Sequence, residues 1–179
     1  MSFAKSCLFK VSLISCSWNG TALIKNRPTA TIWAEVRFFA FNNLLIDGVA
    51  AAERIIAFDP SYISKAGKST YGKGKYWSGV AGASKLGLEI GGFAVVDVKN
   101  NSAFHLQAYQ TPASLELKND GLTVLTHYGN LVTQNALKFK KISDYMVANA
   151  YFSKAPFMEA TLASDMHLIS RLPDDSVLF

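Results

Sequence analysis

The chain has 179 residues, of which 50% are hydrophobic and 12% aromatic, so it is long enough for one domain with a core and too apolar for a disordered chain. Its net charge of +5 suits a nucleic acid or another polyanion as partner, but a charge of this size does not identify one. No run reaches the roughly 18 consecutive apolar residues that a membrane span needs, so we expect a cytoplasmic protein that does not cross a membrane.

The first part of the chain carries no firm pattern. Residues 1–30 remain unassigned, and residues 31–179 are expected to form the domain. Two cysteines, Cys7 and Cys16, do not make a disulfide framework. The segment LISC at 13–16 loosely resembles a bacterial lipoprotein cleavage site, which leaves a small exported lipoprotein as an alternative. The apolar run there is short and broken by serines, which argues against a signal peptide.

The next elements follow from hydrophobic spacing. Apolar residues recur near helical spacing over 31–50, which predicts a helix that ends near Gly48. Residues 55–58 form a continuous apolar run, which predicts a buried strand that Pro60 should end. Residues 64–79 contain four glycines and four lysines, which predict a flexible basic loop.

The second half of the chain predicts an antiparallel strand pair followed by alternating helices and strands. In order, these elements are strands 86–98 and 103–109, helix 121–141, strand 144–152, helix 156–163 and strand 167–171. A hairpin followed by helix and strand in alternation indicates an α/β domain, a mixed sheet flanked by helices. The ribonuclease-H-like arrangement has this order.

Asp59 and Asn149 each fall at the end of a predicted buried strand. Phosphodiester cleavage by two divalent ions needs several convergent carboxylates, and Asp59 fits the first of these. The alternative for Asp59 is a turn-initiating aspartate before proline. Asn149 could ligate only through an uncharged carbonyl oxygen, so a hydrogen-bonded amide is the favoured interpretation. Asp97 could neighbour Asp59 across the sheet, although an ordinary acid beside a turn is favoured.

Basic and aromatic side chains gather between the first two predicted strands. Lysine ammonium groups neutralise phosphates and aromatic faces stack on bases, so this segment is the best candidate for contact with DNA. A solvated loop is the alternative. The candidate residues are Lys65, Lys68, Lys73, Lys75, Tyr76, Trp77 and Lys85.

Several phrases, in order along the chain, resemble one family. They are FNNLLIDG, ERIIAFDPSYISKAGK, YWSGVAGASKLGLEIGG, AVVDV, AFHLQAYQTP, ANAYFSKAPF and HLISRLPDD. From about residue 38 onward the chain is similar to the catalytic region of the DDE-type transposases of bacterial insertion sequences. The resemblance implies a ribonuclease-H-like fold, dependence on Mg²⁺ or Mn²⁺, and cleavage and strand transfer of DNA.

The resemblance also assigns roles to single residues. Asp59 matches the first catalytic acid, a metal ligand, and Asn149 stands where the family has its second acid. The third acid, a glutamate on a later helix, has no counterpart before the chain ends at Phe179. The resemblance therefore implies a truncated, catalytically impaired transposase with an incomplete fold, whose uncovered apolar surface would favour self-association. The alternative is a non-catalytic DNA-binding protein that modulates an intact transposase.

Overall fold

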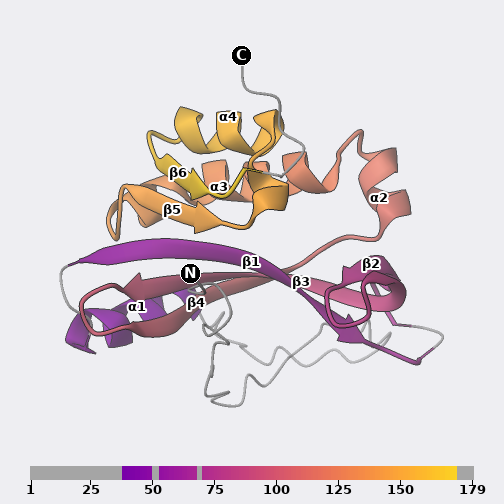
Figure 1. Cartoon of the computed structure of the whole chain (residues 1–179), viewed down its shortest axis with the longest axis horizontal. Coiled ribbons are helices and arrows are strands. Elements are labelled where there is room, and N and C mark those ends of the chain that lie inside the picture. Colours follow the sequence, from indigo (N-terminus) through magenta and orange to yellow (C-terminus); the bar gives the residue numbers. More distant parts are fainter. Residues whose placement is uncertain (1–37, 50–52, 68–69, 173–179) are drawn as a thin grey trace, which may run out of the picture.

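The computed structural model describes residues 38–49, 53–67 and 70–172. In chain order the elements are α1 (Phe38–Val49), β1 (Arg54–Ser64), β2 (Gly74–Ser78), β3 (Ala83–Asp97), β4 (Ser102–Gln110), α2 (Ser114–Asn119), α3 (Val124–Lys140), β5 (Tyr145–Ala148), the 3-10 helix η1 (Ala150–Phe152), α4 (Ala155–Ala163) and β6 (His167–Ser170). Within this part of the chain, six strands form one open sheet (Figure 1).

The sheet is mixed, as the sequence predicted. Its strands lie in the order β2-β3-β1-β5-β6, and β4 also pairs with β3 (Figure 1). Strand β3 runs antiparallel to β1, β2 and β4, whereas β5 runs parallel to both β1 and β6. Parallel neighbours need a crossover connection, and the helix α4 supplies it between β5 and β6. The predicted α/β class, a mixed sheet with flanking helices, is confirmed.

The core is built around Phe58 of β1. Its ring lies 4.7 Å, between ring centroids, from Phe93 on β3 and 4.7 Å from Tyr128 on α3. Side chains from α1, α3 and α4 join the same buried cluster, among them Ile46 and Phe157, so these helices cover one face of the sheet. Burying a side chain such as Phe58 contributes about 1.5–3 kcal/mol, which fixes β1 and the residue that follows it.

Strand β1 continues past the proline that was expected to end it. Its pairing with β3 extends to Ser64, and Pro60 faces Gly91. Pairing with β5 ends at Phe58, so beyond that point β1 has a neighbour on one side only. A proline is tolerated in such an edge position because one side of the strand makes no ladder hydrogen bonds. The prediction that Pro60 stops the pairing is therefore wrong.

The predicted loop 64–79 contains the strand β2. Tyr76 anchors this strand, because its side chain is 5% exposed and its hydroxyl lies 2.9 Å from the carbonyl oxygen of Gly72 and 3.1 Å from that of Thr111. The short helix α2 was also missed. The hydrogen bond from Tyr76 to Thr111 joins positions 35 residues apart, so no local sequence pattern indicates it. The glycines and lysines of 64–79 therefore predicted a loop where the structure has β2.

Other predicted elements agree to within a few residues, with two corrections. The second buried strand is short, because β5 ends at Ala148 and Asn149 caps η1. The glycines Gly91 and Gly92 predicted a bulge, bend or turn within the strand 86–98, but the register shift of β3 lies between Phe93 and Ala94. Gly91 is instead required because a Cβ atom there would overlap the Tyr128 ring.

Some predictions fall outside the described residues. They concern residues 1–30 with both cysteines, the first part of the helix predicted over 31–50, and Lys68. Among the helices that the structure does describe, none is both long and apolar enough to cross a membrane.

Candidate functional site

Asp59 and Asn149 meet at one edge of the sheet. Strands β1 and β5 are parallel neighbours, with Phe58 opposite Ala148, so the next residue of each strand emerges at the same edge. The amide nitrogen Nδ2 of Asn149 donates a hydrogen bond of 3.0 Å to Oδ1 of Asp59, although the two residues are 90 positions apart. In open α/β sheets, ligands bind at the carboxyl ends of the strands, and this pair lies at the carboxyl end of β5, where its parallel pairing with β1 stops.

The orientation of the Asn149 amide is fixed by its second partner. The backbone N–H of Tyr151 donates to Oδ1 of Asn149 at 3.0 Å, which caps η1. The side-chain oxygen of Asn149 therefore accepts a hydrogen bond from Tyr151, and the NH₂ group is turned toward Asp59. The hydroxyl of Ser170 holds the backbone oxygen of Asn149 at 3.0 Å. The amide thus offers Asp59 a donor.

The carboxyl group of Asp59 is in an unusual electrostatic setting. Desolvation raises its pKa above the ordinary value, and the hydrogen bond from Asn149 lowers it by a smaller amount. Among the described residues, no lysine or arginine forms an ion pair with Asp59. The negative charge of this carboxylate is therefore not offset by a described cation, and its one hydrogen bond from a neutral amide leaves it available to a ligand.

A hollow of about 530 Å³ opens beside this pair. It lies between the last part of β1 and the residues that end β2 and follow it. The residues that line it are Asp59, Pro60, Ser61, Tyr62, Trp77, Ser78, Gly79, Val80 and Asn149. Its volume is within the range of about 300–1,000 Å³ that is usual for small-molecule sites.

The donor set does not fit a two-metal centre. Mg²⁺ and Mn²⁺ prefer several hard oxygen ligands, but this site offers one carboxylate and an amide that presents its nitrogen. In residues 38–49, 53–67 and 70–172, no group of three or more His, Cys, Asp or Glu residues could hold a metal ion.

Asp97 lies at the opposite end of β3 from this site. It pairs with Arg54, whereas Asp59 pairs with Gly92, so the interpretation of Asp97 as a neighbour of Asp59 is wrong. The side chain is 1% exposed, and it accepts hydrogen bonds from the backbone N–H of Asn100 at 3.0 Å and from its Nδ2 at 2.8 Å. The favoured interpretation of an acid that holds the following turn is confirmed.

Glu89, which carried no distinguishing context in the sequence, belongs to a buried polar network. The hydroxyl of Thr111 donates to its Oε1 at 2.9 Å, and Thr111 is in turn hydrogen-bonded to the hydroxyl of Tyr128. Burial raises the pKa of Glu89, and the negative charge of Asp59 adds a smaller increase. The partners of Glu89 come from distant segments, so no local pattern could have identified it.

Four of the predicted basic residues, Lys65, Lys73, Lys75 and Lys85, lie on and around one end of the sheet. We call this end the arm and define it as residues 60–64 of β1, all of β2, and residues 83–90 of β3. Lys75 pairs with Leu86 and Trp77 with Ser84, and directly paired residues share a face of the sheet.

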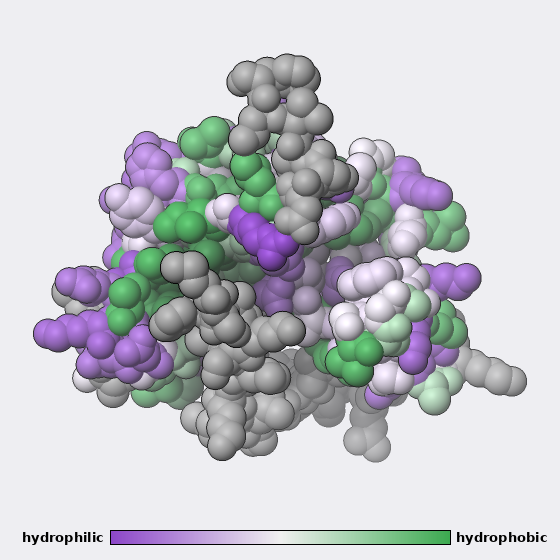
Figure 2. Space-filling view, in the orientation of Figure 1, coloured by the Kyte–Doolittle hydropathy of each residue, from purple (hydrophilic) through white to green (hydrophobic). Residues whose placement is uncertain are grey.

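The exposed members of the arm are mixed in character. Trp77 and Leu86 expose 63% and 53% of their surface, and Lys75 and Lys85 are also exposed. Figure 2 shows hydrophobic and hydrophilic residues side by side at this end, at the lower right. Lys65 follows β1, and Lys73 donates to the carbonyl oxygen of Gly67 at 2.6 Å, so these two lie beside the arm.

Tyr76 differs from the other predicted contact residues, because it is buried and holds β2 from within.

Comparison with protein-family models, with curated proteins and with solved structures found no match.

Proposed function

We propose that this chain is a ribonuclease-H-like domain of the DDE-transposase type, which binds DNA but has an impaired catalytic metal centre. The observation that carries the proposal is the contact between Asp59 and Asn149, the residues that directly follow the parallel pairing of β1 with β5. The sequence resemblance implies the first and second acids of the family at these two positions. The strand order β4-β3-β1-β5-β6, antiparallel and then parallel, supports the same proposal.

The impairment follows from the charge of the pair. A carboxylate at position 149 would offset the charge of Mg²⁺ or Mn²⁺, whereas the amide of Asn149 carries no charge and uses its oxygen to cap η1. Asp59 alone is a weak site for such an ion. The lysines of the arm are independent of this loss, so binding of DNA is expected to persist while cleavage fails.

A nicking assay on supercoiled DNA with Mg²⁺ or Mn²⁺ tests the proposal. We expect no nicking by the unmodified chain, and little by Asn149→Asp, because no third acid accompanies the pair among the described residues. Asp59→Ala is the control for contaminating nuclease. Robust metal-dependent nicking by the unmodified chain that Asp59→Ala abolishes would contradict the proposed impairment.

The second candidate function is that of a non-catalytic DNA-binding protein that modulates an intact transposase. The exposed lysines of the arm favour it, and their replacement tests DNA binding directly. The variant Lys75→Ala/Lys85→Ala is compared with Lys99→Ala/Lys141→Ala, which removes the same charge elsewhere on the exposed surface.

We expect the arm variant to reduce the slope of log K against log salt by about 0.9 for each phosphate that is no longer neutralised, and the control variant to leave the slope unchanged. Equal slopes for the two variants would show that the arm does not bind the phosphates. Modulation is then measured as inhibition of strand transfer by an intact transposase of the same type.

Self-association remains a further prediction. Leu137 on α3 and Leu162 on α4 expose 84% and 61% of their surface, and exposed apolar side chains favour contact between copies. Light scattering over a range of protein concentrations should show a rise in mean mass. A constant monomer mass would contradict the prediction.

A further inference from the structure

The hollow beside Asp59 combines an aromatic wall with a polar floor. Trp77 lines it and is 63% exposed, so its indole ring is accessible to a flat ligand. Ser78 and Val80 line it at the end of β2 and in the following turn. Stacking on a tryptophan suits any nucleobase, because every base has a π-face.

The pair of Asp59 and Asn149 presents an acceptor beside a donor. Asp59 retains Oδ2 as an acceptor, because the bond from Asn149 goes to Oδ1. Nδ2 of Asn149 carries two hydrogens, of which one is used in that bond. The pairing edge of a nucleobase likewise carries a donor beside an acceptor, and flipped bases are read by hydrogen bonds to this edge together with stacking.

Charge decides which part of a DNA strand enters the hollow. The carboxylate of Asp59 repels phosphates, whereas Lys75, which shares a face of the arm with Trp77, attracts them. A strand that approaches the arm is therefore expected to place its backbone on the lysines and one base in the hollow. In the part of the chain that the structure describes, no group of three or more metal-ligating residues adjoins the pair, so a divalent cation would compete only weakly for the space.

We infer that the hollow binds one unpaired nucleobase of DNA without a metal ion, stacked on Trp77 and hydrogen-bonded at its pairing edge by Asp59 and Asn149. The inference rests on the proposed function, which supplies DNA as the ligand. It adds that the incomplete catalytic centre recognises a base, and that DNA with an unpaired base is preferred to a perfect duplex.

Fluorescence anisotropy in the presence of EDTA tests the inference. The probes are a labelled oligothymidine of about 12 nucleotides, the same strand with abasic sites, and a duplex of equal length. We expect Trp77→Ala to weaken binding of oligothymidine by about 5- to 100-fold, the range of one base stack. Trp77→Phe should retain most of the affinity, and duplex binding should change less than about twofold.

Two comparisons separate the possible outcomes. The unmodified chain should prefer oligothymidine to the abasic strand, and Trp77→Ala should lose this preference, whereas the exposed-leucine control Leu162→Ala should keep it. Equal binding of both strands by the unmodified chain, or binding that requires Mg²⁺, would overturn the inference while leaving the proposed DNA binding intact. Failure to bind any of the three probes would contradict the proposed function itself.

Discussion

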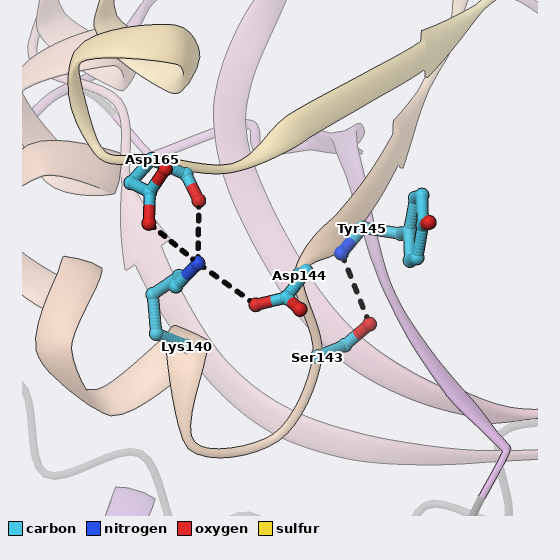
Figure 3. A network of polar contacts seen from close by, with 5 residues as sticks. All are labelled: Lys140, Ser143, Asp144, Tyr145 and Asp165. Atoms are coloured by element: carbon cyan, nitrogen blue, oxygen red, sulfur yellow. Dashed lines mark hydrogen bonds and ion pairs between the residues drawn. The ribbon is translucent and has the colours of Figure 1, made fainter.

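Acidic side chains at the two ends of β5 have partners of different charge. At the amino end, Nζ of Lys140 lies 2.8 Å from Oδ1 of Asp144 and 2.8 Å from Oδ2 of Asp165 (Figure 3). The hydrogen bond from Lys140 lowers the pKa of Asp165. At the carboxyl end, Asp59 has only a neutral amide as partner among the described residues, and desolvation raises its pKa. Acids at the amino end are neutralised within the chain, whereas Asp59 at the carboxyl end remains open to a ligand.

The amino end also shows what a structural charge cluster does for this fold. Asp165 has a φ of 55°, in the left-handed region that few residues adopt without support. Lys140 donates to its backbone oxygen at 2.7 Å as well as to its carboxylate, so one side chain holds the turn that leads into β6. Nothing comparable in charge holds Asp59 among the described residues, so the two ends of β5 differ in whether their carboxylates have a cationic partner.

The largest effect is expected from Asn149→Asp, which makes the carboxyl end fully acidic. The new carboxylate can still cap η1, but it replaces the hydrogen bond to Asp59 with repulsion between like charges. In EDTA we expect the free energy of unfolding to fall by about 1–2 kcal/mol. Mn²⁺ should recover part of this loss in the variant and have no effect on the unmodified chain, as measured by thermal unfolding.

The double variant Asp59→Asn/Asn149→Asp is the matched control for this prediction. It exchanges the carboxylate and the amide, so the pair has one charge and one hydrogen bond as before, and its stability in EDTA should return toward that of the unmodified chain. A double variant as unstable as Asn149→Asp alone would show that repulsion between the two carboxylates is not the cause.

The sequence predicted the position of this pair but not its chemistry. The apolar run before Asp59 and the second run before Asn149 were enough to predict two buried strands, and parallel pairing then brings their ends together. The direction of the Asn149 amide depends on the backbone N–H of Tyr151 and on a carboxylate 90 positions away. Hydrophobic periodicity carries no information on either contact.

The elements that the sequence missed share one cause, which is stabilisation by distant contacts. Strand β2 lies in a segment rich in glycine and lysine, and buried Tyr76 fixes it to the carbonyl oxygens of residues after β4. Glu89 alternates with apolar neighbours like any strand residue, and only Thr111 and Tyr128 distinguish it. Such positions become recognisable only when the fold brings their partners together.

An intermediate effect is expected from Glu89→Gln, which removes a half-buried acid whose pKa is affected by the charge of Asp59. The pKa of Glu89 is raised above 4.5 in the folded chain, so as the pH increases the unfolded chain loses its proton first. The folded state then becomes relatively less stable, until the pH exceeds the folded-state pKa. Urea unfolding of the unmodified chain should therefore show stability falling above about pH 4.5, and the variant should show a flatter profile.

Glu159, exposed on α4, provides the control for this pH dependence. Glu159→Gln removes the same charge and side-chain type from an exposed position, so it controls for the loss of one carboxylate as such. Glutamine at position 89 can still accept the hydrogen bond from Thr111, so the comparison isolates the charge. Parallel profiles for Glu89→Gln and the unmodified chain would contradict the assignment.

The smallest effect is expected from Lys140→Met, which removes the cation from the amino end. Lys140 is half-buried, but Asp144 and Asp165 expose 57% and 92% of their side chains. Ion pairs so open to water contribute little, so the Tm should fall by only a few degrees at low salt. The difference from the unmodified chain should shrink at about 1 M salt, where the Debye length is about 3 Å. It should also shrink in acid, because the stabilisation from the lowered pKa of Asp165 is lost as the pH falls through that pKa.

Lys141→Met removes the neighbouring charge on the same helix end, and an equal loss in that variant would mean that the helix dipole, and not the pairs with Asp144 and Asp165, is responsible.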